Sequence, residues 1–248
     1  MTATVSSPET FRWRFASAAP EPCRALLAAG AWLGQAVLLK SNRRRAVYLV
    51  PGEPGMIVKH DRSPGFLDRL KARWRPAGAR EFAATEAARR AGVPVPAPIG
   101  HAQRGGESLF AATEVPNCVK LRHAWAEAQG DRPGRESLLA ALHRFASAFA
   151  AARVVHPDMH PGNLLVCRDG ADLSCVLVDL AGARVLPPGR PADAWDTAGW
   201  LTHLAPALRP AEAAAILCQA GIAPTPDDAA RLWRSEERRV GKECRSRW

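Results

Sequence analysis

The segment VVHPDMHPGNLLV, at residues 154–166, limits the folds open to this chain more than any other part of it. Apolar residues close both ends of the segment, and Pro157 and Pro161 prevent a continuous helix between them. The polar side chains that gather within eight positions are His156, Asp158, His160 and Asn163. The segment therefore predicts a polar loop between two core elements.

The elements around this loop predict a two-lobed α+β fold. Strands are expected within 36–60, where turns separate three apolar runs, and at 108–115. Helices are expected at 77–92, at about 136–153 and from about 192 onward. Asp169-Gly170 lies between two apolar runs and predicts a hairpin directly after the loop. Strands that crowd the first half and helices that crowd the second are typical of α+β proteins.

The lobes can be assigned to parts of the chain. We expect a β-rich N-lobe at 21–116 and a mostly helical C-lobe at 117–234. Residues 1–20 are expected to be poorly ordered. The tail SEERRVGKECRSRW, at 235–248, has no apolar periodicity and resembles translated vector sequence, so we exclude it from the fold.

Composition limits the partners and the compartment. The net charge of +10 suits anionic partners, although a solvated arginine-rich surface explains it equally well. The sequence has no run of 18 apolar residues and no secretory leader, so we expect neither a transmembrane helix nor export. The six cysteines form no C-x-x-C pair, which favours free thiols in a reducing cytosol over disulfides or a metal site.

The polar loop has the residues that phosphoryl transfer from ATP requires. Such a reaction needs a carboxylate to orient the acceptor hydroxyl and accept its proton, and oxygen ligands to hold Mg²⁺ against the phosphates. Asp158 suits the first role. Asn163, five residues later, and Asp179, at the exit of the strand VLV, suit the second. His156 would brace the loop. The spacing H-x-D-x-x-x-x-N followed by Asp is that of the kinase catalytic loop.

HPDMHPGNLLV together with VDLAGAR resembles the atypical branch of the protein-kinase-like superfamily, whose loop has the form H-x-D-x-H-x-x-N. That branch includes the lipopolysaccharide core kinases (Kdo and heptose kinases), the aminoglycoside and choline phosphotransferases and the RIO kinases. The resemblance implies a protein-kinase-like fold that uses ATP and Mg²⁺. It also implies that His160 replaces the loop lysine that contacts phosphate in protein kinases.

Upstream segments extend the resemblance over roughly residues 36–200. Lys59, at the end of the strand MIVKH, matches the lysine that steadies the ATP phosphates. AREFAATEAARRAGVPVP resembles the helix that supplies the glutamate partner of this lysine, which would be Glu81, with Glu86 as second choice. FAATEV resembles the strand before the hinge, where backbone groups of Glu114 and Val115 would hold adenine.

Two departures from the protein-kinase pattern stand out. KSNRRR occupies the turn where a G-x-G-x-x-G loop would cover the phosphates, and Arg43, Arg44 and Arg45 in it suit either a solvated turn or a contact with phosphate or membrane. No A-P-E segment follows Asp179, which favours a small-molecule or glycolipid acceptor over a protein.

Within this branch the short chain, the basic segment LLKSNRRRAVYLV and the segment DAWDTAGWLTHL favour the lipopolysaccharide core kinases. Asp196 in the last segment would brace the catalytic loop. The expected acceptor is a sugar of the lipopolysaccharide inner core, Kdo or heptose. The expected location is cytoplasmic, with peripheral contact to the anionic inner membrane.

Other readings remain open at this point. The chain could be an aminoglycoside- or choline-type phosphotransferase, although its C-lobe is not notably acidic. It could be a kinase-like nucleotide-binding module without catalysis, since it lacks the glycine-rich loop. Asp158 and Asn163 could be turn and cap residues. A His156–His160 metal site is disfavoured by the prolines. No nucleic-acid partner is expected, because no basic motif is interleaved with aromatic residues.

Overall fold

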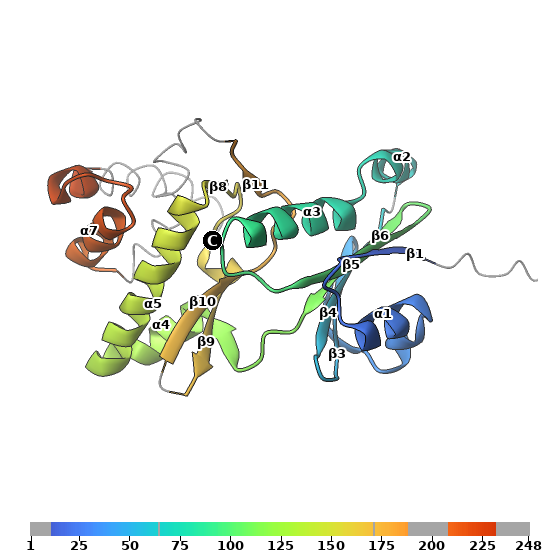
Figure 1. The fold of residues 1–248 in the computed structure, drawn as a ribbon, viewed down its shortest axis with the longest axis horizontal. Helices are drawn as coiled ribbons and strands as arrows, with labels where there is room; N and C mark the ends of the chain where they lie inside the picture. Colours follow the sequence, from blue (N-terminus) through green and yellow to red (C-terminus); the bar gives the residue numbers. More distant parts are fainter. Residues whose placement is uncertain (1–10, 64, 171, 188–207, 232–248) are drawn as a thin grey trace, which may run out of the picture. The chain divides into compact units, whose positions relative to one another are not determined.

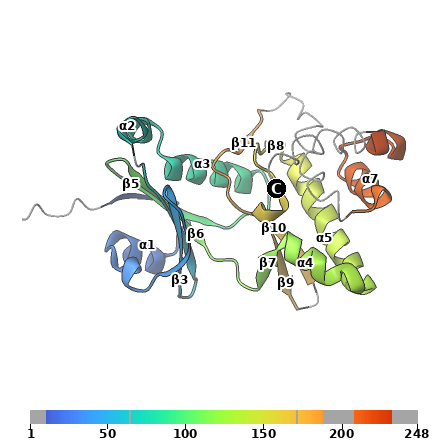
Figure 2. The same cartoon turned by 180° about the vertical axis from the view of Figure 1, so that it is seen from behind.

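The computed structural model describes residues 11–63, 65–170, 172–187 and 208–231, and the structural statements below concern these residues. The chain forms two compact units. Unit 1 consists of residues up to 83 and residues 97–114, and unit 2 consists of residues 84–96 and those from 115 onward. Figures 1 and 2 show the elements of each unit.

Unit 1 is built on a six-stranded antiparallel sheet in the order β1-β5-β6-β4-β3-β2. Its strands are β1 (Arg12–Phe15), β2 (Val37–Ser41), β3 (Arg45–Val50), β4 (Met56–Asp61), β5 (Pro98–Arg104) and β6 (Glu107–Thr113). Its helices are α1 (Glu21–Ala28), η1 (Ala31–Gly34), α2 (Phe66–Trp74) and the first half of α3 (Ala77–Arg90). The helices α1 and α3 lie on opposite sides of the sheet (Figures 1 and 2).

The prediction that residues 1–20 are poorly ordered is wrong for the residues from Arg12 onward. Strand β1 pairs with β5, with Arg12 opposite Gln103 and Phe15 opposite Gly100. Ala16 and Ala19 then enter the hydrophobic core of unit 1, at 9% exposure each. The alternation in RWRF was too short to distinguish a strand from an extended terminus, and its pairing partner lies almost 90 residues along the chain.

Unit 2 is mostly helical around two small sheets, ordered β10-β9-β7 and β11-β8. Its helices are the second half of α3, α4 (Leu121–Glu127), η2 (Ala128–Gly130), α5 (Arg132–Ala151), η3 (Pro161–Asn163) and α7 (Pro210–Gln219). Its strands are β7 (Cys118–Lys120), β8 (Val154–Val155), β9 (Leu164–Asp169), β10 (Asp172–Leu177) and β11 (Arg184–Val185). The expected hairpin at Asp169-Gly170 joins β9 to β10.

The expected lobe boundary at 116 differs from this division. Residues 84–96, the second half of α3 and the segment after it, belong to unit 2. Val93 is buried in the core of unit 2, and the N–H of Leu177 donates to the carbonyl of Pro94 over 2.9 Å. The chain returns to unit 1 only from residue 97 to 114, so one cut in the sequence cannot separate the units.

The prediction of free thiols is wrong for Cys118 and Cys167, which form a disulfide between β7 and β9. The two residues lie directly opposite each other in the register of these strands. They are 49 residues apart in a sequence without a cysteine pattern, so only the strand pairing reveals them. Cys23, Cys175 and Cys218 are free, and burial raises the pKa of Cys175 to about 12.

Several expectations lie outside the described residues: the poor order of residues 1–10, the start of the helical segment from about 192, the bracing role of Asp196, and the vector-like tail at 235–248. Within the described part of the chain, no helix combines the length and apolarity needed to span a bilayer.

Helix α5 supplies the centre of the core of unit 2. Leu138, Leu142, Phe145 and Phe149 are each at most 1% exposed, and the rings of Phe145 and Phe149 stack with their centroids 5.7 Å apart. These positions recur every three to four residues, so they form one apolar face of the helix.

We therefore expect Phe145→Ala to lower the free energy of unfolding by about 3–5 kcal/mol, because the change removes buried surface and leaves a cavity. Urea denaturation measures the loss. Ser137→Ala, at an exposed position of the same helix, should change the value by less than about 0.5 kcal/mol. A loss of under about 1 kcal/mol for Phe145→Ala would contradict this packing.

Candidate active site

The structure brings Lys59 and Glu81 together in unit 1. The Lys59 Nζ lies 2.5 Å from Glu81 Oε1, and the side chain of Glu81 is 1% exposed. Lys59 lies inside β4 rather than at its end as expected. A carboxylate this deeply buried is stable only beside a cation, so the pair fixes both side chains.

The start of α3 sets the position of Glu81. The N–H of Gly78 donates to Ser108 Oγ over 3.1 Å, which satisfies one backbone donor of the first helical turn. A Cβ atom at position 78 would lie 2.2 Å from the carbonyl oxygen of Leu109. Only glycine allows the helix to approach β6 this closely, and Glu81 follows one turn later.

Arg45 and Asp61 form a second ion pair beside the first, which the sequence analysis missed. Arg45 Nε lies 2.6 Å from Asp61 Oδ1, and the Arg45 guanidinium lies 4.0 Å from Glu81 Oε2. Arg45 is thus no solvated turn residue but the first residue of β3. In the pairing of β3 with β4, Arg45 lies directly opposite Asp61. A correct alignment of these two predicted strands would therefore have predicted the ion pair.

The turn before β3 is closed by a side chain rather than by glycine. Asn42 Oδ1 accepts the N–H groups of Arg44, over 2.8 Å, and of Arg45, over 2.7 Å. This is an asparagine turn, in which the side chain replaces a backbone acceptor. These two N–H groups are bonded to Asn42. A phosphate at this turn would therefore be bound by side chains rather than by these amides.

The expected adenine-binding residues lie where the chain leaves unit 1, since the division between the units falls between Glu114 and Val115. The N–H of Glu114 donates to the carbonyl of Gly55 over 2.8 Å. Glu114 therefore has its carbonyl, not its N–H, for a nucleotide base. A Cβ atom at Gly55 would lie 2.1 Å from Glu114 Oε2, so a larger residue there would require the Glu114 side chain to move.

His156 connects the polar loop of unit 2 to Asp179. Its Nε2 lies 2.9 Å from the carbonyl oxygen of Asp179, and its Nδ1 accepts the N–H of Asp158 over 3.2 Å. One donor and one acceptor are the capacity of the neutral imidazole. Burial lowers the pKa of His156 below its ordinary value, although the hydrogen bond to Asp179 acts in the opposite direction. The neutral ring is therefore the form that holds the loop.

Asn163 is oriented by a second set of contacts. Its Nδ2 donates to the carbonyl of Asp158 over 3.0 Å, and its carbonyl accepts the N–H of Val178 over 2.8 Å. The first contact assigns the amide nitrogen, so Oδ1 is the atom that could meet a cation. The second contact holds Asn163 beside the strand that ends next to Asp179.

His160 stabilises the turn in the loop itself. Its Nδ1 accepts the N–H of Gly162 over 3.0 Å and so caps the short helix η3. Only Nε2 of His160 could then meet a phosphate, the role that the sequence resemblance suggested.

Asp179 has a φ of +63°, in the left-handed region that few residues other than glycine adopt. Asparagine and aspartate tolerate this region better than other residues, and such strain is concentrated at functional sites. The hydrogen bond from His156 to the Asp179 carbonyl holds the strained backbone in place.

The oxygen atoms of Asn163 and Asp179 fit Mg²⁺, which binds few protein ligands and takes the rest from water and phosphate. Among the described residues no group of three or more His, Cys, Asp or Glu side chains could hold a metal ion.

Comparison with known proteins shows to which of the expected families the chain belongs. The model of the lipopolysaccharide kinase (Kdo/WaaP) family matches residues 68–195, just over half of the chain. The chain belongs to this family. The match includes Glu81 and the whole polar loop, and it begins after Lys59. The protein is therefore a kinase of the lipopolysaccharide core, and membership of a kinase family implies the use of ATP.

Solved structures support the fold. WaaP in complex with acyl carrier protein matches with a TM-score of 0.67 and 19% identity, over 93% of this chain and 98% of that one. The bifunctional kinase-methyltransferase WbdD matches with a TM-score of 0.50 and 16% identity, over 79% of this chain and 43% of that one. The expected protein-kinase-like fold is confirmed. No curated protein matches the chain.

Buried His156 and half-buried His143 predict how stability depends on pH. Burial lowers the pKa of both His143 and His156 in the folded protein. Below about pH 6.5 the unfolded chain binds protons that these folded side chains do not, so stability should fall as the pH drops from 7 toward 5.5. Each group contributes at most about 1.4 kcal/mol per pH unit.

We expect His143→Gln to reduce this slope, measured by urea denaturation at several pH values. The exposed His123→Gln is the matched control and should leave the slope unchanged. An unchanged slope in the His143 variant would mean that this side chain is protonated equally well in both states.

Proposed function

We propose that the protein transfers the γ-phosphoryl group of ATP, with Mg²⁺, to a sugar hydroxyl of the lipopolysaccharide inner core, on Kdo or heptose. The observation that carries this proposal is the hydrogen-bonded loop in which His156 and Asn163 hold Asp158 and Asp179. A turn or cap needs no such connection between residues 23 positions apart.

In this reaction Asp158 orients the acceptor hydroxyl and accepts its proton. The oxygen of that hydroxyl forms a bond to the γ-phosphorus while the bond to the β,γ-bridging oxygen breaks, and ADP leaves. Asp158 is exposed and its backbone is fixed at both sides, by His156 at its N–H and by Asn163 at its carbonyl.

The remaining residues bind the nucleotide. Asn163 Oδ1 and the Asp179 carboxylate hold Mg²⁺, which neutralises charge on the phosphates when bound. Lys59, positioned by Glu81, contacts the α and β phosphates. Backbone groups of Glu114 and Val115 contact adenine, with Glu114 contributing its carbonyl. His160 contributes Nε2 to a phosphate.

The acceptor accounts for the expected location. Lipopolysaccharide core sugars are carried on a lipid, so the enzyme would meet them at the cytoplasmic face of the inner membrane. The net charge of +10 favours an anionic glycolipid and an anionic surface.

The central test is Asp158→Asn, which preserves the size of the side chain and removes the base. We expect phosphate transfer to inner-core glycolipid to fall by about 10²–10⁴-fold in kcat, with ATP affinity nearly unchanged. Asp172→Asn, at an exposed position of the β9–β10 hairpin, is the matched control and should retain full activity.

The same assay separates the competing readings. Transfer to an aminoglycoside or to choline, but not to core glycolipid, would replace the proposed acceptor. ATP binding without transfer to any of these acceptors would indicate a binding module. Equal activity of Asp158→Asn and the wild type would overturn the role of Asp158.

A further inference from the structure

Helix α2 presents apolar side chains to solvent. Leu67, Leu70 and Trp74 are 69%, 47% and 83% exposed. They lie at positions i, i+3 and i+7, so they form one face of the helix. Single apolar residues are common on surfaces, whereas here three of them are aligned on one helix face.

The helix is held on the sheet with this face outward. Gln103 of β5 donates from its side-chain amide to the carbonyls of Ala72, over 3.2 Å, and Arg73, over 3.3 Å. These bonds satisfy carbonyls at the end of the helix, which would otherwise lack partners. The apolar row is therefore exposed on an anchored element, not on a frayed terminus.

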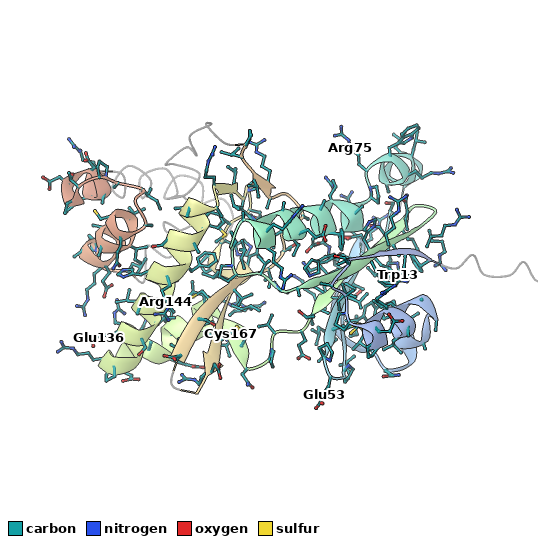
Figure 3. All side chains as sticks on the ribbon, viewed as in Figure 1. Trp13, Glu53, Arg75, Glu136, Arg144 and Cys167 are labelled. Atoms are coloured by element: carbon teal, nitrogen blue, oxygen red, sulfur yellow. A yellow bond between two sulfur atoms is a disulfide. The ribbon has the colours of Figure 1, made fainter. Side chains whose placement is uncertain are left out.

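Beside this row lies a strongly basic cavity of about 740 Å³. Leu70 and Trp74 line it together with four arginines, which are Arg44, Arg62, Arg75 and Arg80. Among the described residues of its wall the one acidic side chain, Asp61, is paired with Arg45. Figure 3 shows Arg75 extending outward beyond the end of α2. The wall thus has a large excess of positive charge next to exposed apolar atoms.

We propose that this surface, formed by Leu67, Leu70 and Trp74 with Arg44, Arg62, Arg75 and Arg80, docks unit 1 on an anionic membrane. The apolar row enters the boundary between headgroups and acyl chains, where tryptophan is favoured. The arginines bind lipid phosphates, which they can hold in bidentate fashion. The proposal rests on the proposed function in one respect, namely that a lipid-borne acceptor gives membrane docking its purpose.

Two features favour a membrane over other anionic partners. A free phosphate would need the arginines but not the apolar row. An acidic protein would use the arginines, but Leu67 lies outside the cavity and, like Trp74, is more than two thirds exposed. Side chains that project this far suit insertion into a lipid interface, which is how short amphipathic helices bind.

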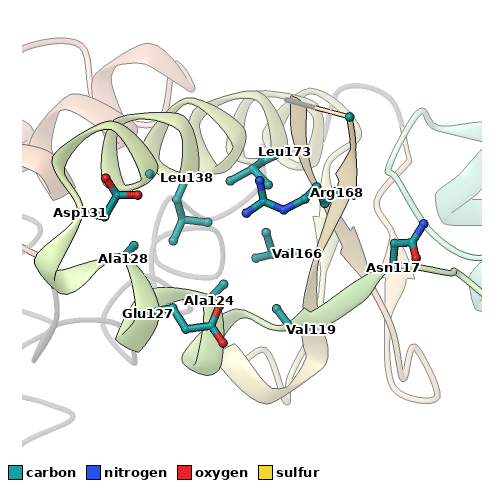
Figure 4. A pocket seen from close by; sticks show the side chains of 12 residues that line it. Asn117, Val119, Ala124, Glu127, Ala128, Asp131, Leu138, Val166, Arg168 and Leu173 are labelled. Atoms are coloured by element: carbon teal, nitrogen blue, oxygen red, sulfur yellow. The ribbon is translucent and has the colours of Figure 1, made fainter.

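A further cavity among the described residues carries no comparable inference. It lies in unit 2, has a volume of about 680 Å³ and is lined by Glu127 and Asp131 on one side and Arg168 on the other, over an apolar floor (Figure 4). Its acidic residues are exposed, and its charges favour no single ligand class.

The test is flotation of the full chain with vesicles of phosphatidylcholine, alone or with about one third phosphatidylglycerol. We expect binding to the anionic vesicles, weakened by salt because charge contributes. Leu67→Ser with Trp74→Ser, and separately Arg62→Glu with Arg75→Glu, should each weaken binding by about tenfold or more. The matched controls are Leu33→Ser with Val119→Ser, and Arg89→Glu with Arg122→Glu, all at exposed positions.

The outcomes are decisive in both directions. Equal binding by the two test variants and their controls would overturn the proposal. Loss in the arginine variant alone would also overturn it and would indicate a site for a free anion or an acidic protein. ATP binding by the same preparations is measured in parallel. Vesicle binding without ATP binding would contradict the proposed function and support the membrane surface. ATP binding without vesicle binding would support the proposed function and overturn the membrane surface.

Discussion

The conformation of the polar loop depends on the two hydrogen bonds made by the neutral side chain of His156. It joins the backbone of Asp158 to the backbone of Asp179, so the proposed base and the proposed metal ligand share one support. A protonated imidazole would have two donors, and Nδ1 could no longer accept the Asp158 N–H. Burial disfavours that form, which makes the buried position of the ring part of the site rather than incidental packing.

The second constraint is the charge balance in unit 1. Glu81 is almost fully buried, and two cations face it: Lys59 at 2.5 Å and the Arg45 guanidinium at 4.0 Å. Asp61 compensates Arg45, so two positive and two negative charges lie within one network. Removing Lys59 would leave the buried Glu81 carboxylate without its nearest cation, which is far less favourable than losing an exposed ion pair. The lysine that is proposed to meet ATP is thus embedded in a structural ion network.

The features of the fold and of the candidate site that the sequence could predict are those that depend on short intervals along the chain. Asp158, Asn163 and Asp179 follow fixed intervals around a proline-containing loop and a hairpin, and the strands β2, β3 and β4 are apolar runs separated by turn residues. Pairings across long separations gave no such signal. Strand β1 and the Cys118–Cys167 disulfide depend on which strands pair and in which register, and the sequence alone does not indicate this.

The turn at Asn42 shows why a missing motif need not mean a missing function. A glycine-rich loop offers backbone N–H groups to phosphates, whereas here Asn42 consumes the N–H groups of Arg44 and Arg45. The turn gains rigidity from these two hydrogen bonds and retains the charged side chain of Arg44, which lines the basic cavity. Arginine binds phosphate through its planar guanidinium without help from backbone amides. In the proposals made for this lobe, an anion would therefore meet side chains of the turn rather than its backbone N–H groups.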